Sequence, residues 1–591
     1  MDYSIKIGGE AGQGIQTIGD TLAKVFSRAG YHVFTHQDYE SRIRGGHNFF
    51  QIRFSEKPIT ASRERIDIIV AFDKESITLH GNEVSENGLI IYDSSALKQK
   101  YEKPQFLDIP FVELAVQQGN KIMANTVATG AVLGMLRLDL DIFNGIMHDT
   151  FRKKGEDVVQ ANLNAAKAGF DFALQNCPKC TFITSSFGEP KMLISGIEGV
   201  ALGVLASGCK FYSAYPMTPS TGIMNYLAGK EKEYGIVVEQ AEDEIAAINM
   251  ALGASFAGVR AMTGTAGGGF ALMVEGLSLA GMTETPIVIA LGQRPAPATG
   301  LPTRTEQGDL LFAIHAAHGE FPRVVFAPGT PEQAFYLTNK AFELAEKFQV
   351  PALIIFDQYL ADSGWTYDRL DATKIRFNDY RIRGDAFKQL KDYKRHAFTE
   401  SGVSPFGVPG DSESLVVTDS DEHDEEGHII EDAETRVKMV QKRLLKKLTL
   451  IRQEIAQPFL YGGNDPDIVL VCWGSLYGVV REVVDIMAKD KKIAMLHFSE
   501  IYPFPLIEEN PSPNPLPQGE GDKGRVNRDY LGLLKNVQLT VCIEQNATGQ
   551  FARLLRAETG YAFTHSINRY DGRPFTVENL MGELHAFVGR L

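Results

Sequence analysis

The stretch VEQAEDEIAAINMALGASFAGVRAMTGTAGGG, residues 238–269, contains the pattern that decides the fold. It starts within a short run of mostly β-branched residues, Ile236–Glu239, which is typical of a buried parallel strand. Small and apolar residues then continue from Glu244 to Phe256, which predicts a helix directly after the strand. The glycines of Met262–Gly269 predict a loop to which a backbone or a ligand comes close.

The same alternation of strand and helix extends to both sides and predicts a domain over residues 192–365. Its short apolar runs predict strands at Phe211–Tyr215, Ile236–Glu239, Val288–Leu291, Val324–Ala327 and Leu353–Phe356. Its helical patterns lie at Ile194–Gly208, Glu244–Phe256, Phe270–Leu279 and Pro331–Phe348. Because the two kinds of element alternate, we expect a mostly parallel sheet covered by helices on both faces.

Two further α/β domains are predicted, at residues 1–185 and 461–591. Their expected strands are Tyr3–Ile7, Ile66–Phe72, Leu89–Tyr92, Ile468–Trp473, Ile493–Phe498 and Val537–Ile543. Their expected helices are 15–30, Ala124–Leu138, Ala161–Leu174, Val479–Met487 and Gln550–Glu558. The predicted fold class is therefore α/β, with several doubly wound, mostly parallel sheets.

Two segments depart from this pattern. Residues 366–460 are charged and poor in aliphatic strands, so we predict a surface linker that ends in one basic helix, Glu434–Ile451. The acidic run in this linker, with His423 and His428, has residue types that bind metal ions, but a solvated linker is the simpler interpretation. Residues 510–524 contain four prolines and three glycines, which exclude a helix or an inner strand and predict an exposed insertion.

The composition limits the classes of protein that this chain can represent. Its 591 residues carry a formal net charge of −15, and phosphate binding needs a basic face, so nucleic-acid binding is not expected. Five cysteines, an odd number, favour a reducing compartment. The start, MDYSIKIGGE, does not resemble a signal peptide, and no apolar run reaches about 18 residues. We expect a cytoplasmic protein that does not enter a membrane.

Four carboxylates lie within six residues where the deciding stretch passes from strand to helix. They are Glu239, Glu242, Asp243 and Glu244. The helix dipole favours acidic residues in a first turn, so most of the cluster is interpreted as capping. One carboxylate at the start of such an apolar helix would be buried, which suits proton transfer. The pattern alone does not decide which of Glu242, Asp243 and Glu244 this carboxylate is.

Polar side chains also follow two other predicted strands of this domain. The turn YPMTPST, residues 215–221, holds Thr218 between two prolines at the end of a strand, where parallel sheets bind ligands. An ordinary helix cap by Thr218 or Ser220 is the alternative interpretation. Arg294 and Arg304 lie near strand ends and suit the recognition of a carboxylate, although each alone is more typical of a surface ion pair.

A glycine cluster follows the first predicted strand. Gly9, Gly12 and Gly14 precede an amphipathic helix, so backbone N–H groups can approach an anion at the start of the helix. A tight turn between strand and helix is an equally good interpretation, because the spacing fits neither GxGxxG nor a Walker loop. The nearby SRIRGGHN, residues 41–48, suggests a phosphate or carboxylate clamp, or else an exposed basic turn.

Together these motifs resemble those of the 2-oxoacid:ferredoxin oxidoreductases. The similarity is greatest to an α subunit of the 2-oxoglutarate type with a γ domain fused at its N-terminus. GGEAGQGIQTIG and RGGHNFFQIRFS are similar to the γ domain. YPMTPST, EQAEDEIAAINMALGASFAG, GQRPAPATGLPTRTEQGDL and HDEEGHIIEDAETRVKMVQKRLLKKL are similar to the α part, which contains the pyrimidine-binding domain. WGSLYG and EQNATGQFARLLR are similar to its transketolase C-terminal-like domain.

The resemblance implies an enzyme that uses thiamine diphosphate, coenzyme A and a ferredoxin. It makes Glu244 the carboxylate that bonds to N1′ of the aminopyrimidine ring and favours the tautomer that removes the proton from the reactive carbon. Tyr215 and Pro216 are implied to contact the cofactor. Thr218 and Arg294 match the residues that bind the carboxylate of the 2-oxoacid.

Further residues are assigned by the same resemblance. Thr303 falls where the family tunes selectivity for the substrate side chain, and Arg304 or His47 is a candidate for a distal carboxylate. The phosphates of coenzyme A are assigned to the first glycine loop, with Gly9, Gly12 and Gly14.

Two expected features of such enzymes are missing from this sequence. It has no GDG…N motif for Mg²⁺ and the diphosphate, and its CPKC, with Cys177 and Cys180, supplies two of the four thiolates that a 4Fe–4S cluster needs. We therefore predict no metal in this chain and assign Mg²⁺, the diphosphate site and the cluster to a β subunit. The expected assembly is a heterotetramer of two α and two β chains, in which the acidic ferredoxin docks on β.

The predicted reaction interconverts 2-oxoglutarate and coenzyme A with succinyl-CoA and CO2, with electrons exchanged with ferredoxin. In one direction this is decarboxylation, and in the other it is CO2 fixation in the reductive TCA cycle. The alternatives are a pyruvate or branched-chain 2-oxoacid oxidoreductase subunit, a non-catalytic CoA- or nucleotide-binding subunit, and a structural subunit of a redox complex.

Overall fold

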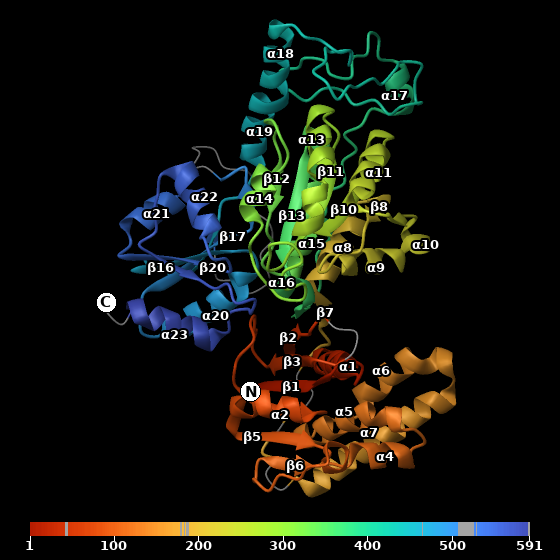
Figure 1. Ribbon diagram of the computed structural model, residues 1–591, viewed down its shortest axis with the longest axis vertical. Helices are drawn as coiled ribbons and strands as arrows, with labels where there is room; N and C mark the ends of the chain where they lie inside the picture. The colour runs from red at the N-terminus through yellow and green to blue at the C-terminus, as the bar shows by residue number, and fades with distance from the viewer. Residues whose placement is uncertain are drawn as a thin grey trace. The chain divides into compact units, whose positions relative to one another are not determined.

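The computed structural model describes all residues except 42–44, 178–179, 183, 185–187, 464, 506–524, 527–528 and 589–591. The chain forms two compact units (Figure 1). The first unit contains Met1–Ser195, Asp362–Leu370 and Thr576–Leu591, and the second contains Gly196–Ala361 and Asp371–Phe575. No helix in the described part of the chain is long and apolar enough to cross a membrane.

The first unit is built on an eight-stranded mixed sheet in the order β6-β5-β4-β1-β3-β2-β14-β7. Its strands are β1 (Asp2–Glu10), β2 (His32–Asp38), β3 (His47–Ser55), β4 (Ile66–Ala71), β5 (Val84–Tyr92), β6 (Phe106–Asp108), β7 (Met192–Ser195) and β14 (Gly364–Tyr367). β1 is parallel to β4 and antiparallel to β3. The sequence did not predict β2 and β3, because antiparallel strands such as HNFFQIRFS mix polar and apolar residues and lack the continuous apolar run of a parallel strand.

The helices of the first unit include a closely packed pair, α5 and α7. They are α1 (Ile15–Arg28), α2 (Lys74–His80), α3 (Ser94–Leu97), α4 (Phe111–Gln117), α5 (Ala124–Leu136), α6 (Asp141–Phe151), α7 (Glu156–Asn176) and α23 (Val577–Val588). A β-carbon on Gly130 would lie 1.9 Å from the carbonyl oxygen of Ala166, and one on Gly169 would lie 2.0 Å from that of Val127. The close approach of the two helices therefore depends on these glycines.

The second unit contains a seven-stranded sheet in the order β18-β12-β13-β11-β10-β8-β9, parallel except for β18. Its strands are β8 (Phe211–Ala214), β9 (Val237–Gln240), β10 (Ala261–Ala266), β11 (Ile287–Gln293), β12 (Val324–Phe326), β13 (Pro351–Asp357) and β18 (Glu500–Tyr502). Its helices are α8 (Gly196–Ala206), α9 (Thr221–Ala228), α10 (Glu231–Tyr234), α11 (Glu244–Phe256), α12 (Gly267–Leu272), α13 (Val274–Met282), α14 (Leu310–His315), α15 (Pro331–Phe348) and α16 (Gln358–Asp362).

Alternate residues of β11 belong to two different cores of this sheet. Ile289 packs in the core that includes Ile248 of α11, whereas Val288 packs in the core that includes Val204 of α8. Successive side chains of a strand point to opposite faces, so helices cover both sides of the sheet. The predicted α/β fold class with doubly wound, mostly parallel sheets is confirmed.

The second unit also contains a six-stranded sheet in the order β19-β15-β17-β16-β20-β21. Its strands are β15 (Phe459–Gly462), β16 (Ile468–Trp473), β17 (Ile493–Phe498), β19 (Arg525–Val526), β20 (Leu539–Glu544) and β21 (His565–Asn568). Its helices are α20 (Tyr477–Met487), α21 (Tyr530–Asn536) and α22 (Gln550–Thr559). β16 and β17 have the predicted bounds, because each is one continuous apolar run.

Two predictions in the domain of residues 192–365 are wrong in detail. The first five residues of Met262–Gly269 belong to the buried strand β10 and are not a loop. The strand has a glycine at 264 because a β-carbon there would lie 2.3 Å from the hydroxyl oxygen of Tyr212. The helix expected to begin at Ile194 begins two residues later, because Ile194 belongs to β7. The domain boundaries at 185, 192, 365 and 460 stay predictions.

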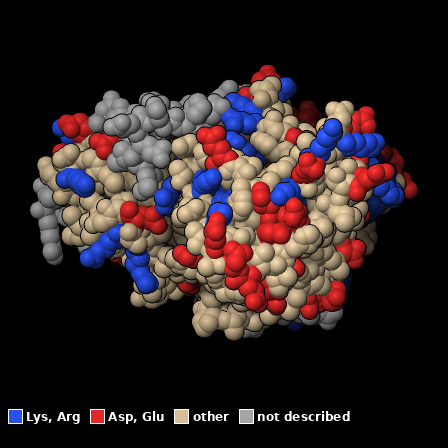
Figure 2. Space-filling view, turned by 90° about the horizontal axis from the view of Figure 1, so that it is seen from above, with Lys and Arg blue, Asp and Glu red and all other residues tan. Residues whose placement is uncertain are grey.

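The charged segment before residue 460 is largely irregular up to a long helical run. It contains α17 (Gly384–Lys388), and it ends in α18 (Ala433–Val440), a π-helical turn (Gln441–Lys446) and α19 (Lys447–Glu454), as Figure 1 shows. On the face drawn in Figure 2, basic side chains lie among acidic and uncharged ones and form no continuous basic area. The insertion predicted at 510–524 lies outside the described residues.

Candidate active site

The start of α11 separates the four clustered carboxylates by burial. Glu244 is only 3% exposed, whereas Glu239 and Glu242 are exposed. Asp243 is the N-cap, and its carboxylate accepts a hydrogen bond of 2.7 Å from the backbone N–H of Ala246. Asp243 therefore caps the helix, and Glu244 is the carboxyl group that the fold buries.

The Glu244 side chain lies against the glycine turn that begins α12. A β-carbon on Gly269 would lie 2.4 Å from Glu244 Oε1 and 2.2 Å from Thr265 Oγ1, so only glycine leaves room for the carboxyl group. Glu244 Oε1 is buried and has no hydrogen-bond partner among the described residues. A buried polar atom without a partner is costly, so this oxygen is the strongest indication of a ligand site in the second unit.

Thr218 and Arg294 are brought together at the same edge of the sheet. The guanidinium of Arg294, just after β11, donates a hydrogen bond of 2.8 Å from Nη1 to the carbonyl oxygen of Thr218. A β-carbon on Gly292 would lie 2.5 Å from Pro219 Cγ, so the turn after β8 packs directly on the end of β11. Of the two residues in the alternative interpretation, Ser220 is the N-cap of α9, although its side chain makes no capping hydrogen bond, and Thr218 is not a cap, because α9 begins at Thr221.

A second buried carboxyl group, which the sequence did not single out, faces Arg294. Asp309 precedes α14, and a β-carbon on Gly267 would lie 2.6 Å from Asp309 Oδ2. Burial raises the pKa of Asp309 to about 6, although Arg294 opposes the change. An aspartate before a helix has the pattern of an N-cap, yet this side chain makes no capping hydrogen bond. The sequence therefore gave no reason to separate it from an ordinary cap.

The remaining predicted residues of the second unit flank this site along the chain. Tyr215, directly after β8, is 42% exposed, and Pro216 is half-buried. Thr303 and Arg304 are half-buried in the loop between β11 and α14. This loop passes close to Gly572, because a β-carbon on Gly572 would lie 3.2 Å from Arg304 Cβ.

The glycine loop and His47 belong to the first unit. Gly12 and Gly14 have φ angles of +92° and +76°, which favour glycine. Gly14 is the N-cap of α1, and no side chain caps this end of the helix. Gly9 lies close to the side chain of Gln13, because a β-carbon on Gly9 would lie 2.4 Å from Gln13 Oε1. His47 Nε2 lies 2.8 Å from His80 Nε2, so this nitrogen already has a partner within the unit. Arg42 and Arg44 lie outside the described residues.

The chain matches two protein-family models. Residues 4–172 match pyruvate ferredoxin/flavodoxin oxidoreductase, and residues 202–442 match pyruvate flavodoxin/ferredoxin oxidoreductase, thiamine diP-binding. The second region contains Thr218, Glu244 and Arg294. The chain is 31% identical over 649 residues to the α subunit of a 2-oxoacid:ferredoxin oxidoreductase of Sulfolobus sp, covering 98% of this chain and 96% of the relative. This chain belongs to the 2-oxoacid:ferredoxin oxidoreductase α subunits.

Several other matches name a substrate. The α subunit is 27% identical, over 85% of its length and 82% of the relative's, to a 2-oxoglutarate oxidoreductase subunit of Mycobacterium tuberculosis. It is similar to the structure of 2-oxoglutarate:ferredoxin oxidoreductase from Magnetococcus marinus with 2-oxoglutarate, coenzyme A and succinyl-CoA bound. That comparison has a TM-score of 0.87, 29% identity and 99% coverage of both chains. The α subunit is thus part of a thiamine diphosphate-dependent enzyme that works with further subunits and ferredoxin.

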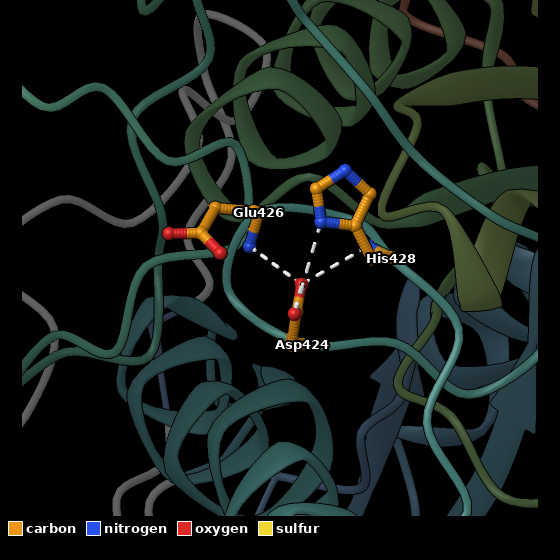
Figure 3. A group of neighbouring side chains, drawn as sticks. All are labelled: Asp424, Glu426 and His428. Atoms are coloured by element: carbon orange, nitrogen blue, oxygen red, sulfur yellow. Dashed lines mark hydrogen bonds and ion pairs between the residues drawn. The ribbon is translucent and has the colours of Figure 1, made fainter.

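Two groups of side chains with metal-binding chemistry in the described part of the α subunit are engaged in other contacts. Asp424, Glu426 and His428 lie close together in a turn (Figure 3), and Asp424 Oδ1 accepts the backbone N–H groups of Glu426 and His428 at 2.9 and 3.0 Å. The turn explains this cluster without a metal ion. Cys177 and Cys180 form a disulfide, and the three other cysteines are buried.

A buried carboxyl group beside the site predicts a pH effect on stability. Asp357, the last residue of β13, accepts hydrogen bonds from the hydroxyl of Ser475 and, at 2.9 Å, from the backbone N–H of Leu360. Burial raises its pKa to about 6. The folded α subunit therefore binds a proton that the unfolded chain releases near pH 4, so this group lowers stability as pH rises from about 4 to 6.

The variant Asp357→Asn should remove that loss. Calorimetry should show that the unfolding temperature of the variant rises relative to that of wild type as pH rises from about 4.5 to 7. The corresponding change in the free energy of unfolding is about 3 kcal/mol at most. The lost carboxylate hydrogen bonds set a constant offset, so the pH-dependent part is the test. A difference between the two proteins that does not change with pH would contradict the assignment.

Proposed function

We propose that this α subunit supplies the pyrimidine half of a thiamine diphosphate site in an enzyme that interconverts 2-oxoglutarate and coenzyme A with succinyl-CoA and CO2. The enzyme exchanges electrons with ferredoxin. In the direction that consumes succinyl-CoA and CO2, the reaction is CO2 fixation. The observation that carries the proposal is the buried Oε1 of Glu244, which has no partner in the described part of the chain. The contact with Gly269 fixes this oxygen beside a sheet edge that also holds Arg294.

Glu244 is suited to bond the ring nitrogen of the cofactor. Thiamine diphosphate, when bound, supplies the carbon that adds to the 2-oxo group and accepts the electrons left by departing CO2. Glu244 would hold a proton at N1′ of the aminopyrimidine ring, in a pocket closed by Gly269 and Thr265. Asp243 fixes the start of α11 and so the position of Glu244. Tyr215 and Pro216 would contact the cofactor from the turn after β8.

Thr218 and Arg294 would bind the carboxylate of the 2-oxoacid. An arginine presents five N–H donors in a plane that matches a carboxylate. The hydrogen bond from Nη1 to the carbonyl oxygen of Thr218 fixes this plane beside the threonine hydroxyl. Burial lowers the pKa of Arg294 while Asp309 opposes the change.

The assignment of 2-oxoglutarate as the substrate rests on candidate residues for its distal carboxylate and on the names of related proteins. Thr303 and Arg304, in the loop after β11, and His47 are the candidates to recognise that group, and Gly9, Gly12 and Gly14 are the candidates for the phosphates of coenzyme A. Several of the matching proteins are named for 2-oxoglutarate. Pyruvate is the competing substrate, because both family models carry its name.

A β subunit would complete the site with Mg²⁺, the diphosphate pocket and a 4Fe–4S cluster, in a heterotetramer of two α and two β chains. Tyr215, in the turn that carries Thr218, and Ile245 of α11 expose large apolar side chains, as do Val237 of β9 and Leu272 of α12, and all four are 42–53% exposed. Exposed apolar residues that gather in one region are typical of a protein interface. The sequence has no GDG…N motif of its own.

Turnover by the assembled complex tests the proposal. The α subunit, co-expressed with the β subunit of its source, should reduce ferredoxin in a CoA-dependent reaction with 2-oxoglutarate. Its kcat/KM for pyruvate and 2-oxoisovalerate should be lower by about tenfold or more, because a site built for a distal carboxylate rejects acids that lack it. Preference for pyruvate would reject the substrate assignment. If the complex releases CO2 from none of the three acids, the catalytic role is rejected.

A further inference from the structure

The loop between β11 and α14 is held by residues of the six-stranded sheet of the same unit. Gln307 is 1% exposed, and its side chain makes two hydrogen bonds to that sheet. Nε2 donates to the carbonyl oxygen of Trp473 at 2.9 Å, and Oε1 accepts the backbone N–H of Gln545 at 3.0 Å. The backbone N–H of Gln307 also donates to the carbonyl oxygen of Gln545 at 2.7 Å.

The residues around Gln307 are fixed by the same segment of the chain. Asn546 Nδ2 donates to the carbonyl oxygen of Gln307 at 3.2 Å. Gln550 Nε2 donates to the carbonyl oxygen of Gly308 at 2.6 Å, and Gln550 Oε1 accepts the N–H of Leu311 at 2.9 Å. The motif EQNATGQ, residues 544–550, therefore holds both the loop and the start of α14.

Contacts outside this motif also hold the loop, and one of them is a hydrogen bond of 3.3 Å from the backbone N–H of Tyr359 to Thr305 Oγ1. The backbone N–H of Asp309 donates to Gln293 Oε1 at 3.1 Å, which ties the end of the loop to β11. The backbone N–H of Thr305 donates to the carbonyl oxygen of Gly572 at 3.3 Å. Thr303 and Arg304 lie directly before these two contacts, in a segment without helix or strand structure. The positions of their side chains depend on the backbone that carries them, together with the contacts that these residues make themselves.

We propose that Gln307, together with Gln545 and Gln550, sets the selectivity for the 2-oxoacid side chain by positioning Thr303 and Arg304. This inference rests on the proposed function, because it assumes that the loop meets the distal end of the substrate. Gln307 is a positioning residue, since it acts through the backbone of the loop. Buried amide groups that exchange hydrogen bonds with backbone fix one register, because any shift of the loop would leave them without partners.

The variant Gln307→Met, in the α–β complex, removes both side-chain hydrogen bonds and keeps a similar volume. We expect kcat/KM for 2-oxoglutarate to fall by about tenfold or more, and that for pyruvate to change by less than about threefold, because pyruvate has no distal carboxylate for the loop to meet. The affinity for thiamine diphosphate, followed by fluorescence quenching, should stay within about twofold, since Glu244 lies against Gly269, which is outside the loop.

A matched control separates positioning from general loss of stability. Asn339 on α15 is a buried amide that clamps backbone in the same way: its Nδ2 donates to the carbonyl oxygen of Arg376 at 2.8 Å, and its Oδ1 accepts the Arg376 N–H at 2.9 Å. Asn339→Leu should lower the unfolding temperature about as much as Gln307→Met. It should leave the ratio of the two kcat/KM values unchanged, because Asn339 holds a different segment.

Each other outcome is also decisive. Equal losses for both substrates, or a loss of stability alone, would overturn the positioning role and leave the proposed function intact. No turnover of 2-oxoglutarate by the wild-type complex would instead reject the proposed function. If Gln307→Met does not assemble, Gln550→Met tests the same loop through its bonds to Gly308 and Leu311, and an unchanged selectivity ratio in that variant would overturn the proposal.

Discussion

Replacing Glu244 by glutamine should lower kcat of the assembled enzyme by about 10²–10⁴-fold, the usual contribution of a positioned acid or base. A carboxyl group can hold a proton against a ring nitrogen of the bound cofactor and exchange it during turnover, whereas a carboxamide cannot. Glutamine has the same shape, so it fits the space that Gly269 leaves beside Oε1. The loss therefore reports the chemistry of the group and not a change of packing.

Two measurements make this prediction specific. Thiamine diphosphate binding to the Glu244→Gln complex, followed by calorimetric titration, should weaken by much less than kcat falls, because the diphosphate would be held by the β subunit. The control Asp243→Asn keeps the N-cap that Asp243 provides to Ala246 and should retain most of the activity. Near-normal decarboxylation by Glu244→Gln would show that Glu244 only supports the architecture.

The sequence was sufficient for the parts of the site that depend on local pattern. Acidic residues before an apolar helix predict capping and one buried carboxyl group, and in the structure Asp243 is the cap and Glu244 is the buried group. The pattern did not decide which residue has which role, and the choice of Glu244 came from the resemblance to the family. Strands β16 and β17 were found for a similar reason, because one continuous apolar run gives a strand its bounds.

The parts that the sequence missed depend on contacts between distant residues. β10 looks like a loop because its residues are small, and it has a glycine at 264 because Tyr212 of the neighbouring strand lies against that position. Asp309 has the pattern of a cap, and nothing near it in the sequence indicates that it faces Arg294. Gln307 looks like any polar loop residue, because its partners at Trp473 and Gln545 lie more than 160 positions away.

A second large effect is expected at Glu284, which lies after α13 and is 1% exposed. Its carboxylate accepts hydrogen bonds from Lys442 Nζ at 2.7 Å and from Lys447, and it lies 3.2 Å from His396 Nδ1. Although burial alone would raise its pKa, the two lysines hold the pKa of Glu284 well below its ordinary value. Burial lowers the pKa of Lys447 to about 8, and the two buried ammonium groups depend on the one carboxylate of Glu284 as their counter-charge.

The variant Glu284→Gln should lower the free energy of unfolding by about 3–5 kcal/mol at pH 7, because it leaves two buried ammonium groups without their counter-charge. The triple variant Glu284→Gln, Lys442→Met, Lys447→Met should recover most of this loss, since apolar side chains need no partner. Calorimetry of the unfolding temperature measures both. Glu434→Gln breaks the exposed pair with Lys438 on the same helical run and should cause no measurable change. Failure of the triple variant to recover would mean that the hydrogen bonds of the cluster, and not its charge balance, hold the helical run in place.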